Sequence, residues 1–200
     1  KSREGTVVDA DDLIDDMIQV ARDMSAELGK LESLTEEEAE STFRMIALGA
    51  LKYFILKVDP RKNMMFNPHE SIDFNGNTGP FIQYTYARIK SVLRKAEEND
   101  IKIINQLNNV VLSEKEKELL KNITLFPGIV KEAGDSYSPA IIANYCYDLV
   151  KEYNQFYHDH SILSEPDLDQ KNFRLILSST IAKIVKKGMN LLGIEMPERM

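Results

Sequence analysis

Residues 75–96 read NGNTGPFIQYTYARIKSVLRKA and join a tight turn to a long amphipathic helix. The turn is predicted by Asn75-Gly76-Asn77, because Asn and Gly tolerate the backbone conformations that tight turns require. Pro80 fits the first turn of a helix, where the missing N–H has no intrahelical partner to lose. The helical stripe that follows consists of Ile82, Thr85, Tyr86, Ile89, Val92, Leu93 and Ala96. We therefore expect a domain boundary near Gly79-Pro80 and a helical domain after it.

The part of the chain before this turn also shows helical periodicity. Apolar stripes over residues 11–28 and 43–55 predict two amphipathic helices. The second helix is preceded by Thr35 and Glu38, which match the capping-box pattern. Between residues 63 and 79 the apolar pieces are too short for a helical stripe, and we expect a small extended excursion there. This part is predicted to be a helical connector.

Three further helices are predicted after the turn. Ser113 begins a second capping-box pattern, and Ser138-Pro139 opens a helix that continues to His158. A last helix spans about residues 170–192 and ends near Gly193. The predicted fold class is all-α: a helical bundle over residues 80–200, preceded by the connector of residues 1–79.

Composition limits the functions that this chain can have. The sequence has 25 basic and 32 acidic residues and a formal charge of −7. That balance argues against a general nucleic-acid coat, which neutralises phosphates with Lys and Arg, but it permits one local basic face. The single cysteine, Cys146, rules out an internal disulfide and suits a reducing cytoplasm. No apolar run is long enough to predict a membrane span.

Three stretches resemble arginyl-tRNA synthetases, a family of class I aminoacyl-tRNA synthetases. They are residues 76–88, residues 51–60 and the ending GIEMPERM at residues 193–200. The resemblance covers essentially the whole chain. It implies that residues 80–200 form the anticodon-binding bundle of such an enzyme. Because the chain begins with Lys1 and not with Met, we expect it to be a fragment, with residues 1–79 a C-terminal remnant of the catalytic domain.

The resemblance also implies partners and cofactors. The full-length parent is expected to be a cytoplasmic ligase that uses ATP and Mg²⁺ to attach L-arginine to tRNA-Arg. The fragment lacks most of the catalytic domain, so we expect it to bind the anticodon arm of the tRNA but to be catalytically inactive alone. No cofactor is expected for the fragment itself, and neither DNA nor a membrane is an expected partner.

Lys1, Ser2 and Arg3 resemble the tail of the mobile signature loop of class I synthetases. In that class the lysine of the loop stabilises the charge that builds on the departing pyrophosphate. Aligned on Gly5, Ser2 falls where the second lysine usually sits, and either Lys1 or Arg3 would supply the charge. The alternative interpretation is a solvated basic turn.

Aromatic and basic residues on two predicted helices are candidates for tRNA binding. Tyr84 and Arg88 lie one helical turn apart and share a face, so they suit stacking on a base or ribose and contact with a phosphate. Their alternative role is packing at the edge of the bundle. Tyr157 occupies, by resemblance, the position of the family's anticodon-contacting aromatic residue, whereas Phe156 is expected in the core. His158 and His160 cannot face one side of a helix, so no metal site is expected.

The last helix and the C-terminus complete the set of candidates. Lys183, Lys186 and Lys187 form a basic stripe that suits the phosphates of the anticodon stem, although such a stripe is also typical of a solvated face. Arg199 and Met200 are candidates by family likeness, with Met200 expected near the anticodon loop.

Two other functions fit parts of the pattern. One is the helical bundle of another class I synthetase, such as the cysteinyl enzyme, although the stretches quoted above favour the arginyl family. The other is a helical module that binds proteins, which composition and periodicity alone would accept. Salt-sensitive, tRNA-selective binding separates the last alternative from tRNA recognition, because phosphate contacts release counterions.

Overall fold

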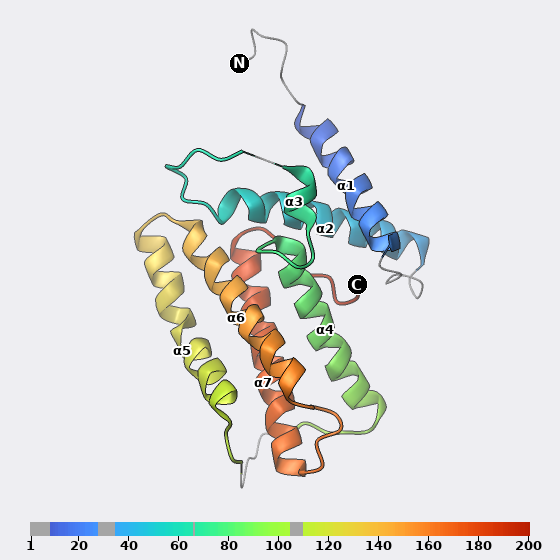
Figure 1. Ribbon diagram of the computed structural model, residues 1–200, viewed down its shortest axis with the longest axis vertical. Coiled ribbons are helices and arrows are strands. Elements are labelled where there is room, and N and C mark those ends of the chain that lie inside the picture. Colours follow the sequence, from blue (N-terminus) through green and yellow to red (C-terminus); the bar gives the residue numbers. More distant parts are fainter. Residues whose placement is uncertain (1–8, 28–34, 66, 105–109) are drawn as a thin grey trace.

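The computed structural model describes residues 9–27, 35–65, 67–104 and 110–200, apart from the side chains of residues 68 and 69. Within these ranges the chain forms seven α-helices and no strand, which confirms the predicted all-α class. The helices are α1 (Ala10–Glu27), α2 (Glu36–Leu56), α3 (Pro68–Ile72), α4 (Gly79–Glu98), α5 (Glu114–Asp135), α6 (Pro139–Asp159) and α7 (Leu168–Leu191) (Figure 1).

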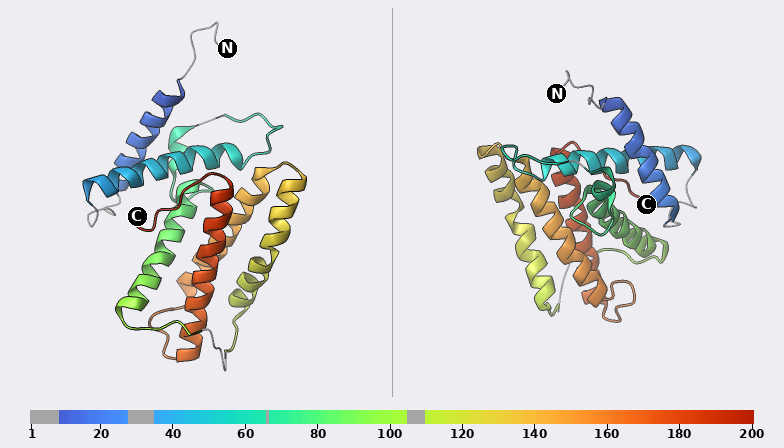
Figure 2. Two further views of the ribbon diagram at one scale, coloured as in Figure 1. Left: turned by 180° about the vertical axis from the view of Figure 1, so that it is seen from behind. Right: turned by 45° about the horizontal axis from the view of Figure 1, so that its top comes forward.

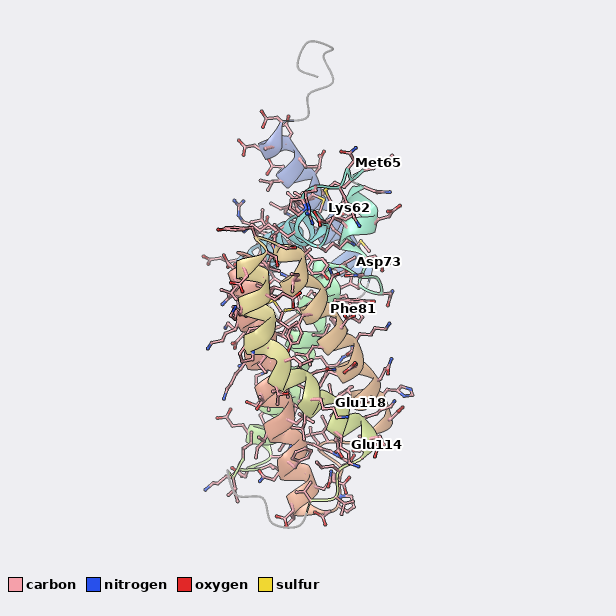
Figure 3. All side chains as sticks on the ribbon, turned by 90° about the vertical axis from the view of Figure 1, so that its left-hand side faces the viewer. Lys62, Met65, Asp73, Phe81, Glu114 and Glu118 are labelled. Carbon is pink, nitrogen blue, oxygen red and sulfur yellow. The ribbon has the colours of Figure 1, made fainter. Side chains whose placement is uncertain are left out.

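The four helices α4 to α7 run side by side as an elongated bundle, and α2 lies across its upper end (Figure 1). α5 packs chiefly against α6, whereas α1 and α3 pack on α2, and α1 points away from the bundle (Figure 2). In Figure 3 the bundle is seen from the side of α5. Glu114 and Glu118 lie at the lower end of that helix, and Met65 lies beyond the upper end of the bundle.

The helix ends lie close to where the sequence predicts them. Thr78 precedes α4, and its hydroxyl oxygen accepts a hydrogen bond from the Phe81 N–H at 3.3 Å. Both predicted capping boxes, at Thr35 and Ser113, are present. Gly193 has a φ of +69° just after α7, a conformation that glycine adopts without the steric cost of a Cβ. These local signals mark the starts of α2, α4 and α5 and the end of α7.

The expected extended excursion between α2 and α4 is wrong over residues 68–72, which form the short helix α3. Asn67 precedes it, and the Asn67 carbonyl accepts a hydrogen bond from the Ser71 N–H at 3.1 Å. Ile72, in the last turn of α3, is fully buried in the cluster that α1 and α2 form. A helix of five residues is too short to show a periodic stripe, so tertiary burial decides its conformation.

Two hydrophobic clusters share one helix, α2. The main cluster fills the bundle, and a smaller cluster lies between α1, α2 and α3. Ile46 and Ala50 of α2 belong to the small cluster, whereas Tyr53 is fully buried in the main one. The Tyr53 hydroxyl donates a hydrogen bond to Asn77 Oδ1 at 2.6 Å. α2 therefore ties the connector to the bundle.

Glycines allow α2 and α4 to approach each other closely. A Cβ on Gly79 would lie 2.4 Å from the carbonyl oxygen of Gly49, and a Cβ on Gly49 would lie 2.5 Å from Nε2 of Gln83. Both distances are shorter than van der Waals contact. The atom near Gly79 is backbone and cannot move aside easily, whereas the atom near Gly49 is the end of the Gln83 side chain, so Gly79 has the stronger requirement for glycine. The contact brings the start of α4 directly against α2.

Candidate nucleic-acid interface

The guanidinium of Arg88 lies near two tyrosine rings that come from two helices. Arg88 and Tyr84 are one turn apart on α4, and Tyr157 comes from the last turns of α6. The guanidinium carbon is 4.8 Å from the ring centroid of Tyr84 and 5.5 Å from that of Tyr157. Both distances are in the range of attractive cation–π contact. Tyr84 and Arg88 therefore lie on one face of α4, as predicted, and the packing of α6 against α4 brings Tyr157 to the same guanidinium.

Asn154 and Thr85 fix the orientation of the guanidinium. Arg88 donates from an η nitrogen to Asn154 Oδ1 at 3.0 Å, and Asn154 Nδ2 donates to the Thr85 hydroxyl at 2.9 Å. That hydroxyl donates in turn to the Phe81 carbonyl at 2.9 Å. Sequence reasoning missed Asn154, although its position one turn before Tyr157 is the signal that would have indicated it.

The tyrosine rings rest on buried aromatic residues. Tyr157 stacks on Tyr153, with centroids 6.2 Å apart and planes inclined by 25°. Tyr153 is fully buried, and its hydroxyl donates to Ser178 at 3.0 Å. Phe74 meets Tyr84 edge-on at 6.3 Å. Both tyrosines of the site are only partly buried, so part of each side chain is exposed to solvent.

The neighbouring Phe156 is fully buried in the main cluster, which confirms the prediction that it is a core residue. His158 is exposed and contacts Asp159 at 2.8 Å. In the part of the chain that the structure describes, no group of three or more His, Cys, Asp or Glu side chains is arranged to hold a metal. Burial also raises the pKa of Cys146 to about 12, so its thiol is protonated at neutral pH.

Met200 packs against the small hydrophobic cluster, as Tyr84 does. The last residue of the chain is therefore close to the cluster beneath one ring of the site. Arg199, just before it, is exposed. The C-terminus lies beside α4 and below α2 (Figure 1).

The three lysines of α7 do not form one uniform stripe. Lys183 and Lys187 are exposed, whereas Lys186 is partly buried. The Lys186 ammonium lies 3.8 Å from a carboxylate oxygen of Glu198 and 5.9 Å from the ring centroid of Tyr86. Two of the lysines are thus open to an external anion, and the third has partners within the chain that the sequence did not indicate.

Lys1, Ser2 and Arg3 lie outside the described residues, so their predicted place in a signature loop stays a prediction. None of the described helices has the length and apolar character that a membrane span requires.

The bundle is all-helical and presents aromatic rings and a guanidinium on one edge, and these are the groups on which proteins stack unpaired bases. The chain belongs to the DALR anticodon-binding domain family, whose model matches residues 82–200.

Similar proteins extend this relationship to the whole chain. It is 68% identical to the arginine–tRNA ligase of Parabacteroides distasonis and 65% identical to that of Bacteroides thetaiotaomicron, over its full length in both cases. The chain spans 34% of each of these relatives. It is also similar in structure to the arginyl-tRNA synthetase of Thermus thermophilus, with a TM-score of 0.87 and 28% identity over 97% of this chain and 32% of that one. The Plasmodium falciparum enzyme gives a TM-score of 0.81 at 26% identity, over 97% and 34% of the two chains.

Proposed function

We propose that this chain is the part of an arginine–tRNA ligase that binds the anticodon arm of tRNA-Arg. The observation that carries the proposal is the Arg88 guanidinium beside the rings of Tyr84 and Tyr157, held by Asn154. Anticodon bases are splayed out of their stack when a protein reads them, and rings stabilise such bases by stacking. The guanidinium contributes a planar cation suited to a base or a phosphate.

In this proposal the basic residues at the bundle surface bind phosphates, whereas the tyrosine rings stack on bases. Lys183 and Lys187 are exposed on α7 and suit phosphates of the anticodon stem, with Lys186 beside them. Arg199 adds an exposed cation at the C-terminus, and Met200 an apolar side chain near the tyrosine site. Phosphate contacts of this kind position the RNA, whereas contacts with bases specify it.

The chemistry of the parent enzyme belongs elsewhere in that protein. We infer that residues 1–79 are the end of its catalytic domain and residues 80–200 its anticodon-binding bundle, and that it uses ATP with Mg²⁺ and L-arginine in the cytoplasm. The described residues form no strand, and a nucleotide-binding α/β fold needs a parallel sheet. The chain alone is therefore expected not to aminoacylate; arginine- and tRNA-dependent consumption of ATP by the isolated chain would contradict this.

The first test is a binding titration of the 200-residue chain with tRNA-Arg and with an unrelated tRNA, at two salt concentrations. We expect a preference for tRNA-Arg that weakens as salt rises, because phosphate contacts release counterions. Tyr157→Ala should lower the affinity by about 5- to 150-fold, the effect of losing one base–aromatic stack of about 1–3 kcal/mol.

A matched control is Tyr137→Ala, since Tyr137 is 90% exposed on the turn between α5 and α6. This change should leave the affinity unaltered. Equal loss in both variants, or equal affinity for the two tRNAs, would argue against recognition at the tyrosine site.

A further inference from the structure

The last eight residues form a C-terminal strap, residues 193–200, that crosses the bundle. The strap leaves the upper end of α7 and passes over α4 beneath α2 (Figure 2, left). It is not helical, yet Ile194, Met196 and Pro197 are buried, and the first two belong to the main hydrophobic cluster. The strap is therefore part of the folded core and not a loose tail.

Side chains of α2 and α4 hold the backbone of the strap. Lys52 Nζ donates to the Gly193 carbonyl at 2.5 Å. Gln83 is fully buried, and its Nε2 donates to the Glu195 carbonyl at 2.8 Å and to the Met45 carbonyl at 3.0 Å. The bonds from Lys52 and Gln83 give the Gly193 and Glu195 carbonyls, which lie beyond the end of α7, a hydrogen-bond partner. The first half of the strap is thus fixed against both helices.

The second half of the strap is fixed by Glu198. Lys90 Nζ lies 3.3 Å and Lys186 Nζ 3.8 Å from the same carboxylate oxygen of Glu198. The Tyr86 hydroxyl lies 3.5 Å from that oxygen, and an η nitrogen of Arg94 donates to the Glu198 carbonyl at 3.1 Å. A single exposed ion pair contributes little, but several charges that converge on one carboxylate form a network. Glu198 therefore joins the strap to α4 and α7 together.

Met200 lies two residues beyond this network. It packs on the small hydrophobic cluster, where the partly buried ring of Tyr84 also packs. Lys90 and Tyr86 are on α4 as Tyr84 is, so the same helix carries both the anchor of the strap and one ring of the site. The position at which Glu198 holds the strap therefore affects where the Met200 side chain lies relative to the ring of Tyr84.

We propose that Glu198 is a positioning residue of the RNA site. Its contacts with Lys90, Lys186 and Tyr86 hold the end of the strap so that Met200 completes the apolar border beside Tyr84. This inference rests on the proposed function, because it assigns Met200 to the surface that the anticodon loop meets. The alternative role for Glu198 is to occupy the cations Lys90 and Lys186 so that they cannot bind a phosphate. Glu198→Gln would then raise the affinity for RNA, whereas a positioning role predicts that the same substitution lowers it.

The test uses the 200-residue chain with Glu198→Gln, Met200→Ala and both changes together. Glu198→Gln keeps the shape of the side chain but removes its charge. We expect affinity for tRNA-Arg to fall by about fivefold, the scale of a small ion-pair network. Met200→Ala should lower it similarly, and the double variant should lose no more than Met200→Ala alone, because the two residues act through one contact. Glu195→Gln, an exposed change on the same strap, is the control.

A second readout separates positioning from RNA binding. The methyl carbon and protons of Met200, observed by NMR and identified by Met200→Leu, should be shifted from random-coil values by the cluster that contains Phe74. Glu198→Gln should move this resonance toward the random-coil position, while the melting temperature changes little. An unmoved resonance, or tighter RNA binding by Glu198→Gln, overturns the proposal. If the unaltered chain does not bind tRNA-Arg, the proposed function fails, and the methyl resonance still decides whether Glu198 positions Met200.

Discussion

At the scale of single residues, Arg88 combines contacts that only a guanidinium makes together. Its planar group lies against two rings and also donates to Asn154. A lysine at this position would keep the charge, but an ammonium has neither the flat face nor the fixed fork of donors. The site therefore depends on the shape of the cation as well as on its charge.

We predict that Arg88→Lys weakens binding of tRNA-Arg nearly as much as Arg88→Ala, by about fivefold or more, since cation–π stacking of this kind contributes about 1 kcal/mol or above. Equilibrium titration at constant salt measures the effect. Arg61→Lys is the matched control, because Arg61 is exposed and pairs with Asp59 in the loop after α2. Full retention of affinity by Arg88→Lys would mean that charge alone is needed.

At the scale of helices, a buried carboxylate attaches the start of α5 to α7. Glu116 closes the capping box of α5, is fully buried, and accepts a hydrogen bond from Arg174 Nε at 2.9 Å. Gln170 also donates to Glu116, and Arg174 reaches Glu165 at 2.6 Å. Burial raises the pKa of Glu116, but the bonds from Ser113 and the ion pair with Arg174 outweigh it, and the net pKa is lowered.

We predict that this carboxylate makes the stability of the chain depend on pH in the acid range. Because the pKa of Glu116 is lower in the folded state, its contribution is present above the pKa of an unfolded glutamate, about 4.3, and is lost as pH falls through the folded value. Glu116→Gln should lower the free energy of unfolding by about 2 kcal/mol at pH 7. The difference from the unaltered chain should shrink as pH approaches 3.

Urea unfolding at pH 7, 5, 4 and 3 measures this dependence. Glu118→Gln is the control, since Glu118 lies exposed two residues further along α5. A difference between Glu116→Gln and the unaltered chain that stays constant across this range would show that the charge of Glu116 does not contribute.

At the scale of the whole molecule, α2 sets how the connector meets the bundle. Tyr53 of α2 packs in the core of the bundle, and Gly49 and Gly79 let α2 and α4 approach closely. Near this contact, Gln83 of α4 donates a hydrogen bond to the Glu195 carbonyl of the strap. The connector, the start of α4 and the C-terminus thus share one packed region. Gln83 of α4 bonds both to a backbone carbonyl of α2 and to the strap.

We predict that Gly79→Ala destabilises the chain by about 1–3 kcal/mol, the usual cost of overpacking, because its Cβ would meet the backbone of Gly49. Gly128→Ala in α5 is the matched control: a Cβ there meets nothing within 4 Å, and replacing glycine by alanine in the interior of a helix stabilises by about 0.5–1 kcal/mol. Thermal unfolding should therefore shift in opposite directions for the two variants. Equal shifts would mean that the contact of α2 with α4 is not tight.

The sequence by itself determined the six longer helices and several of their faces. Capping residues and Gly193 mark helix ends because they act on the nearest backbone groups, and Tyr84 and Arg88 share a face because helical periodicity places them there. The burial of Phe156 follows from the same periodicity. These signals are local, so they can be derived without knowing how the helices pack.

Only the tertiary structure decided which faces meet. Asn154 reaches Arg88 from 66 residues away, and Glu198 of the C-terminal strap pairs with Lys90 of α4. The short helix α3 likewise forms where burial of Ile72 favours it, against the expected extended excursion. Such pairings depend on how the helices cross once the core is packed, and that geometry is a property of all the side chains in the core together.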